Sequence, residues 1–117
     1  QNAVIGNFKE GVTAPKFNSG GIRALDYMGV QVTSCGHDHC NDYCVLDDSS
    51  SKDIWLCFGG GGGEGGYAGY GGTERRIRTY DIDTTKMSIY TWKRLRGSPN
   101  EIFDYQLMVS DGIPNAV

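Results

Sequence analysis

The stretch Ser34-Cys35-Gly36-His37-Asp38-His39-Cys40-Asn41-Asp42-Tyr43-Cys44 carries two histidines one residue apart, directly after a short apolar run. In an extended backbone, side chains two positions apart leave the same face, so His37 and His39 can converge on one metal ion or on two adjacent ions, while Asp38 points the other way. An isolated His-x-His pair is more often two solvated loop histidines. The glycine and the polar residues around this pair favour a site.

The residues before this stretch predict a short helix followed by a strand. Asn18 and Ser19 are good N-cap residues, apolar residues recur at three-residue spacing through 22–28, and Gly29 suits the C-terminal cap. The β-branched run 30–35 predicts a strand. Ligands in open α/β sheets gather beyond the carboxyl ends of strands, which is where this arrangement puts the two histidines.

The rest of the chain supplies about three more strands. Compact apolar or alternating runs predict strands at 54–58, 75–82 and 87–95, the last two joined by a hairpin loop at 83–86. The remaining segments read as irregular: a lead-in at 1–17 that carries no chemistry, a surface loop at 40–53 and, after a closing turn at 97–100, a tail at 101–117 whose apolar residues can pack back. We therefore expect a single α+β domain with one short helix and about four strands in a mainly antiparallel or mixed sheet.

Residues 59–72 hold ten of the 18 glycines. This composition is typical of a flexible linker, but the segment joins two predicted strands of one small domain and carries Tyr67 and Tyr70. We expect an ordered loop that lines a site and offers backbone N–H groups to an anion. No Gly-Lys-Ser or Gly-Lys-Thr follows, so it is not a phosphate-binding P-loop. Arg75 or Arg76, just after it, can reach a phosphate or pair with a nearby glutamate.

The four cysteines leave three alternatives open: one or two disulfides, a structural zinc site, or buried thiols. Their spacings do not match the paired Cys-x-x-Cys knuckles of structural zinc sites, which counts against zinc. The cysteines are Cys35, Cys40, Cys44 and Cys57.

Composition limits the classes of partner. A chain of 117 residues with 38% hydrophobic residues folds as one small domain with a thin core. A net charge of −3 argues against nucleic acid as a partner. No apolar run approaches the roughly 20 residues of a membrane span, and the first residues do not resemble a signal peptide. Secretory pathway and cytoplasm both stay open.

Together these elements resemble the calcineurin-like metallophosphoesterases, in the purple-acid-phosphatase-like branch that includes fungal cell-cycle-regulator phosphatases. The resemblance covers residues 11–105. It rests on the following blocks, which occur in the right order: Asn18-Ser19-Gly20-Gly21, Gly36-His37-Asp38-His39 with the sequel Asn41-Asp42-Tyr43-Cys44, Trp55-Leu56-Cys57-Phe58-Gly59-Gly60, and the Gly-Tyr repeats leading to Arg75-Arg76.

The resemblance implies a binuclear centre, iron with zinc, manganese or a second iron, that activates a hydroxide to attack a phosphate ester or phosphoprotein. It implies that His37 binds one metal and His39 the other as the catalytic ligands. Because relatives carry matching cysteines, it also implies that Cys44 and Cys57 are neighbours able to form a disulfide. The residues expected to lie toward substrate are Asn41, Asp42, Tyr67, Tyr70 and Arg75.

Only one of the five ligand blocks of such a centre, the Gly-His-x-His block, is present. The resemblance therefore implies that residues 1–117 are the C-terminal portion of a larger enzyme, supplying one helix and most of one sheet of a two-sheet sandwich. We expect this portion to be inactive alone, to lack a metal pair of its own, and to need the remaining N-terminal part of the domain. An exposed sheet edge would otherwise invite self-association into a dimer, swapped assembly or aggregate.

Two further functional classes stay open beside the hydrolase segment. The first is a non-catalytic binding or self-associating module that uses the Gly/Tyr loop and exposed strand edges. The second is a small disulfide-rich secreted protein whose histidines are incidental.

Overall fold

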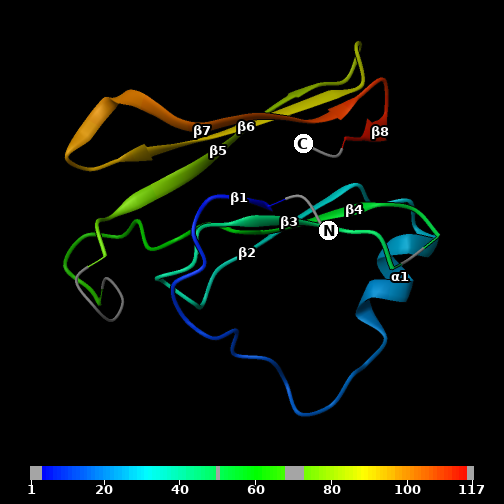
Figure 1. Cartoon of the computed structure of the whole chain (residues 1–117), viewed down its shortest axis with the longest axis horizontal. Coiled ribbons are helices and arrows are strands. Elements are labelled where there is room, and N and C mark those ends of the chain that lie inside the picture. Colours follow the sequence, from blue (N-terminus) through cyan, green and yellow to red (C-terminus); the bar gives the residue numbers. More distant parts are fainter. Residues whose placement is uncertain (1–3, 50, 68–72, 116–117) are drawn as a thin grey trace.

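The computed structural model describes residues 4–49, 51–67 and 73–115. Within these residues the chain forms one helix and eight strands, which confirms the α+β class. Two sheets lie face to face, and the helix lies beside the first sheet on the side away from the second (Figure 1). In chain order the elements are β1 (Val4–Ile5), α1 (Gly21–Tyr27), β2 (Val32–Cys35), β3 (Cys44–Asp47), β4 (Ile54–Phe58), β5 (Arg76–Asp83), β6 (Ser88–Leu95), β7 (Ser98–Ser110) and β8 (Ile113–Pro114).

The first sheet is mixed and has the order β1-β3-β4-β2. β2 runs parallel to β4, so the segments that follow both strands leave the same end of the sheet. The N–H of Gly59 donates to the carbonyl of Cys35 over 3.0 Å. This bond joins the histidine segment (36–43) to the glycine segment (59–72, of which the structure describes 59–67) at that end of the sheet. The predicted strand at 54–58 is confirmed. The predicted loop at 40–53 is wrong over Cys44–Asp47, where alternating buried residues pair antiparallel with β4.

The second sheet is antiparallel with the order β5-β6-β7-β8. The predicted hairpin is confirmed, and its loop is closed by Asp83, whose carboxylate accepts the N–H groups of Thr85 and Lys86, each over 2.9 Å. The predicted turn at 97–100 and the predicted tail at 101–117 are wrong, because 98–110 is a long strand. The register of β6 against β7 shifts three times, and this irregular pairing accommodates Pro99 near the start of the strand. The expected four strands are thus eight, in two sheets.

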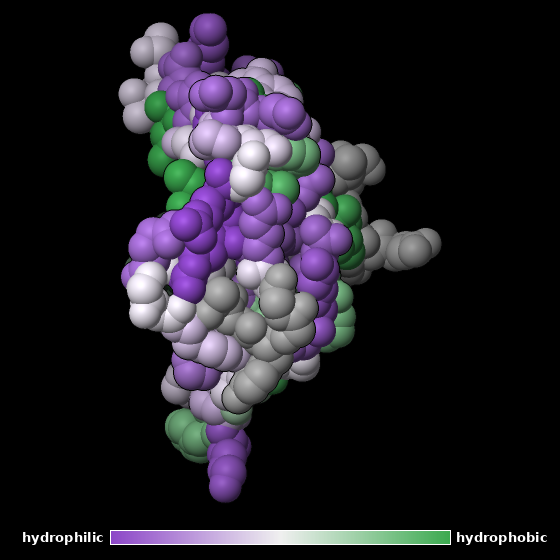
Figure 2. Space-filling model, turned by 90° about the vertical axis from the view of Figure 1, so that its left-hand side faces the viewer, coloured by the Kyte–Doolittle hydropathy of each residue, from purple (hydrophilic) through white to green (hydrophobic). Residues whose placement is uncertain are grey.

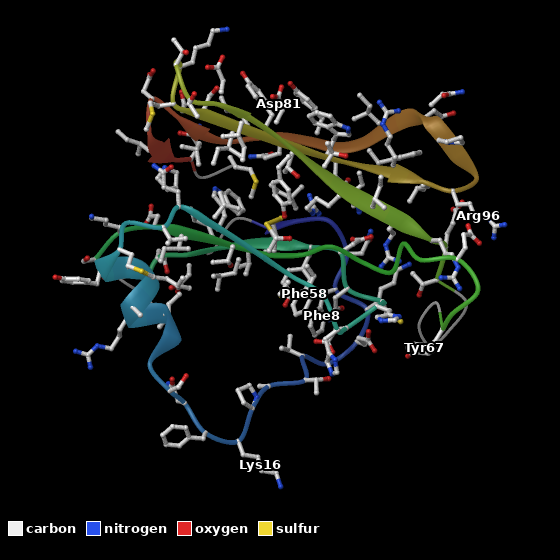
Figure 3. All side chains as sticks on the ribbon, turned by 180° about the vertical axis from the view of Figure 1, so that it is seen from behind. Phe8, Lys16, Phe58, Tyr67, Asp81 and Arg96 are labelled. Atoms are coloured by element: carbon white, nitrogen blue, oxygen red, sulfur yellow. A yellow bond between two sulfur atoms is a disulfide. The ribbon has the colours of Figure 1, made fainter. Side chains whose placement is uncertain are left out.

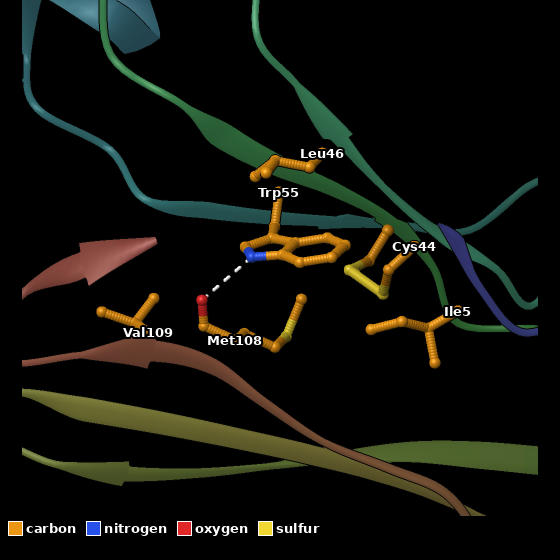
Figure 4. Close-up of a cluster of buried hydrophobic side chains, with 7 residues drawn as sticks. Ile5, Cys44, Leu46, Trp55, Met108 and Val109 are labelled. Atoms are coloured by element: carbon orange, nitrogen blue, oxygen red, sulfur yellow. Dashed lines mark hydrogen bonds between the residues drawn. A yellow bond between two sulfur atoms is a disulfide. The ribbon is translucent and has the colours of Figure 1, made fainter. Parts of the chain in front are cut away.

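A small core joins the two sheets (Figure 4). The indole N–H of Trp55 donates across it to the carbonyl of Met108 over 2.9 Å. Cys44 and Cys57 form a disulfide between β3 and β4, the pair that the resemblance implied. The buried core residues are Ile5, Cys44, Leu46, Trp55 and Cys57 of the first sheet with Met108 and Val109 of the second.

The predicted helix is present at 21–27, and its N-cap is Gly20 rather than Asn18 or Ser19. Asn18 instead accepts the N–H of Gly20 over 2.9 Å and so shapes the turn into the helix. Gly29 follows the helix with φ of 72°, as a C-terminal cap requires. Over the described residues, no helix has the length and apolar character that a bilayer span would need.

Candidate functional site

The histidine segment is not extended. His37 has φ of 79°, in the left-handed region that non-glycine residues rarely adopt, so the alternation of side chains along a strand does not apply to it. The strand geometry from which we expected both rings to share a face is therefore wrong. The ring of His37 is exposed, Asp38 is buried, and His39 is half-buried.

The N-terminal lead-in holds this segment in place. Asp38 accepts the N–H of Thr13 over 3.1 Å and its hydroxyl over 2.8 Å, and these bonds keep the pKa of Asp38 below its ordinary value. Phe8 packs against the ring of Tyr43, with centroids 5.6 Å apart, and Tyr43 packs against Phe58, with centroids 5.4 Å apart. Phe8 and Phe58 lie close together in Figure 3. Residues in which the sequence indicated no chemistry thus fix the shape of the histidine loop.

His39 is oriented by the glycine segment. Its Nδ1 lies 2.9 Å from the carbonyl oxygen of Tyr67, and the two rings lie 4.8 Å apart at 36°. A carbonyl only accepts, so Nδ1 carries a proton, and in the neutral ring the lone pair is then on Nε2. Histidines that bind metals usually donate their second ring N–H in this way, which fixes the ligating nitrogen. His39 therefore fits one ligand position of a metal site.

Asn41 is fully buried and acts on the backbone of the lead-in. Its side-chain oxygen accepts the N–H of Lys9 over 2.9 Å and of Glu10 over 3.1 Å, while its amide donates to the carbonyl of Glu10 over 2.9 Å. The predicted contact of Asn41 with substrate stays a prediction. The contacts observed here are structural.

Asp42 is the centre of a buried ionic network between the sheets. Arg76 Nε lies 2.6 Å from one carboxylate oxygen and Lys93 Nζ lies 2.9 Å from the other. Lys93 also lies 2.5 Å from Asp104, and the N–H of Asn7 donates to Asp42 over 2.8 Å. Burial would raise the pKa of Asp42, but the bonds from Lys93, Asn7 and Arg76 outweigh it and hold the pKa below its ordinary value.

The two arginines that follow the glycine segment, Arg75 and Arg76, make different contacts. Arg76 is buried and donates to the carbonyl of His39 over 3.0 Å, so the ionic network supports the histidine loop directly. Arg75 donates to the carbonyl of Gly66, next to Tyr67. The structure therefore gathers His39, Tyr67 and Arg75 around the described part of the glycine segment, whereas Tyr70 lies outside the described residues.

The described residues do not build a complete metal centre. Across 4–49, 51–67 and 73–115, no group of three or more His, Cys, Asp or Glu side chains is placed to hold an ion. Two imidazoles alone do not fit a dinuclear centre, because each metal needs further ligands and the ionic charge needs carboxylates. Any such centre would need ligands from outside this set.

Sequence reasoning did not identify the roles of Arg76, Lys93 and Thr13. The signal for Lys93 was present: in an alternating strand it shares its face with Thr91, and both residues point inward and are buried. A lysine on an inward face requires a carboxylate partner. No local pattern marked Thr13, whose partner Asp38 is 25 residues away.

Phosphatase-like proteins of yeast and plants share much of this sequence. The chain is 65% identical over all its 117 residues to "Phosphatase DCR2" of Saccharomyces cerevisiae, covering 20% of that protein. It is 37% identical over 118 aligned residues, 92% of its length, to "Probable inactive purple acid phosphatase 29" of Arabidopsis thaliana, covering 29% of that protein. The chain belongs to the purple-acid-phosphatase-like proteins. The family that the motifs indicated is confirmed.

The match to this family is partial in length. The chain spans between a fifth and a third of the purple-acid-phosphatase-like relatives, including 24% of "Probable inactive purple acid phosphatase 28" of Arabidopsis thaliana, to which it is 37% identical over 100 residues. No family model matches the chain. No solved structure matches it either.

Proposed function

We propose that this chain is a segment of a metal-dependent phosphoric-ester hydrolase, to which it supplies His37 and His39 as metal ligands. The observation that carries the proposal is the bond from His39 Nδ1 to the carbonyl of Tyr67, in a chain 65% identical to a phosphatase. The bond fixes the tautomer that a metal ligand needs. In the intact enzyme, iron paired with zinc, manganese or a second iron would activate water for attack on the ester.

The chain alone is expected to be inactive, because the described residues offer too few ligands. The missing ligands would come from the rest of the phosphoesterase domain, since the match covers 20% of the yeast phosphatase. In this proposal the two facing sheets are part of the family's sandwich, and Tyr67 and Arg75 lie toward the substrate.

A chimera tests this function. The chain would replace the matching stretch of the yeast phosphatase, and turnover of p-nitrophenyl phosphate would be measured. We expect turnover in the chimera, no turnover by the chain alone, and a loss of about 100-fold or more in His37→Ala and His39→Ala chimeras. Arg23→Ala, an exposed change on α1, is the matched control. Full turnover in both histidine variants would refute the proposal.

The names of two relatives favour a second function. Both Arabidopsis proteins are named "probable inactive". A related scaffold can therefore serve as a binding or self-associating module, using the glycine segment and the strand edges. An inactive chimera that is folded and binds no iron, zinc or manganese would favour this alternative.

A further inference from the structure

A cavity of 260 Å³ opens where β5 and β6 meet the glycine segment, and His39 is not among the residues that line it. Four arginines and one glutamate line it, although the whole chain has a net charge of −3. Figure 2 looks at this end of the molecule and shows strongly hydrophilic residues gathered at its middle. The cavity is therefore a local concentration of positive charge that the overall composition does not explain.

Three of these arginines have N–H donors to spare. Arg94 donates to the carbonyl of Pro99 over 2.8 Å, and Arg75 donates to the carbonyl of Gly66, neither of which neutralises a charge. Arg96 pairs with Glu64 over 3.1 Å, but both side chains are more than three-fifths exposed, so this pair is weak. A guanidinium has five N–H groups in a planar fork that matches a carboxylate.

The fourth arginine, Arg76, is different because its charge is balanced. It is buried against Asp42 and donates to the carbonyl of His39, so it forms a fixed inner wall. The charge available to a ligand therefore comes from Arg75, Arg94 and Arg96.

The rest of the lining is apolar. Ile77, Leu95 and Pro99 contribute to it, and Ile77 is 55% exposed. A methyl group added to Gly62 would lie 2.9 Å from the side chain of Ile77, so the glycine segment packs closely along this wall. A small inorganic anion would leave the apolar surface uncovered, whereas a peptide that alternates acidic and apolar side chains would cover both.

We propose that this arginine-lined cavity binds an acidic peptide segment whose carboxylates pair with Arg75, Arg94 and Arg96 and whose apolar side chains cover Ile77 and Leu95. Two features of the cavity define this ligand: the positive charges of the arginines select carboxylates, and the apolar surface of Ile77 and Leu95 selects apolar side chains. Binding needs no metal and no phosphatase activity. Arg75 also belongs to the proposed function, but Arg94 and Arg96, which the experiment changes, do not, so the two proposals can fail separately.

Fluorescence anisotropy with a fluorescein-labelled peptide of alternating Glu and Leu tests the proposal. We expect the wild-type chain to bind it, and the double variant Arg94→Ala/Arg96→Ala to bind about tenfold more weakly or worse. The control Arg23→Ala/Lys86→Ala removes the same charge from exposed positions outside the cavity and should bind within about twofold of wild type. Circular dichroism would verify that each variant is folded.

Two further arms separate the peptide from other anions. Ile77→Ser should weaken binding of the Glu/Leu peptide but not of a Glu/Ser peptide. Equal binding by the wild-type chain and the double arginine variant would overturn the proposal. So would equally strong competition by a single-stranded oligonucleotide or by inorganic phosphate, because the cavity would then accept any polyanion.

Discussion

Asp42 joins three parts of the chain, since it binds Arg76 of β5, Lys93 of β6 and the backbone of Asn7. Replacing Asp42 by Asn leaves two buried cations without a full counter-charge. We expect a loss of about 3–5 kcal/mol in the free energy of unfolding, the usual result of removing one partner from a buried pair. Urea denaturation would measure it.

The matched control for this substitution is Asp81→Asn. Asp81 is exposed and points away from the first sheet (Figure 3). An exposed change of this kind alters stability by about 0.5 kcal/mol or less. If both variants were equally stable, the buried ionic network would not support the fold.

The carboxylate of Asp42 also makes the free energy of unfolding depend on pH. Because the pKa of Asp42 is lowered in the folded chain, its contribution is complete above its unfolded pKa of about 3.9 and is lost as the pH falls through the folded value. The difference in stability between wild type and Asp42→Asn should therefore be constant from about pH 5 to 7 and shrink below about pH 4. Denaturation midpoints across this range would measure it, and a gap that widened in acid would contradict the assigned sign.

At the scale of segments, Gly60 in the glycine segment is a position that favours glycine for two reasons. Gly60 has φ of 74°, and a Cβ there would lie 2.9 Å from Nε of Arg76, which the ion pair holds in place. We expect Gly60→Ala to cost about 1–2 kcal/mol or more, from the positive φ and the displaced guanidinium. Thermal unfolding would measure it.

Gly63→Ala is the control within the same segment. Apart from its chain neighbours, no atom lies within 4 Å of the place that a methyl group would take on Gly63, and its φ is not in the left-handed region. We expect this change to be neutral, or to stabilise by a few tenths of a kcal/mol through the unfolded state. Equal destabilisation by both alanines would mean that general loop entropy, and not contact with Arg76, sets the requirement.

The elements that the sequence predicted are those with a continuous apolar run or an unbroken period. The strand at 54–58 is a continuous apolar run, and the strands at 76–83 and 88–95 and the helix at 21–27 have a period. β3 was missed because its four residues lie inside a polar window, and β7 because Pro99 and the acidic residues Glu101 and Asp104 interrupt its pattern. Pairing with β4 and β6 makes these segments strands, and local sequence cannot show pairing across such separations.

Within the site, the sequence predicted that the histidines follow a strand. Because β2 runs parallel to β4, the histidines and the glycine segment leave the same end of the sheet. The contacts of His39 with Tyr67 and of Asp42 with Lys93 span 28 and 51 positions in the chain. No periodicity reports such contacts. The resemblance to a family indicated which residues matter, but not that the lead-in would hold the segment.

At the scale of the whole molecule, each of the two described sheets has two edge strands, and these four strands differ in length: β1 and β8 have only two residues each. β2 ends the first sheet as a four-residue strand, whereas β5 ends the second as an eight-residue strand. Ile77 and Ile82 on β5 are 55% and 62% exposed. Long edge strands with exposed apolar side chains are templates for pairing with another chain. The β5 edge is therefore the expected site of self-association of the isolated chain.

Sedimentation equilibrium at several protein concentrations tests this expectation. The weight-average mass of the wild-type chain should rise with concentration, and Ile82→Lys, which places a charge on the β5 edge, should weaken association about tenfold. Met28→Lys adds the same charge at a side chain that is 66% exposed at the end of the helix and outside the second sheet, so it should leave association unchanged. A mass equal to one chain at every concentration would show that the β5 edge is protected by its own twist and charges, and the exposed isoleucines would then need another explanation.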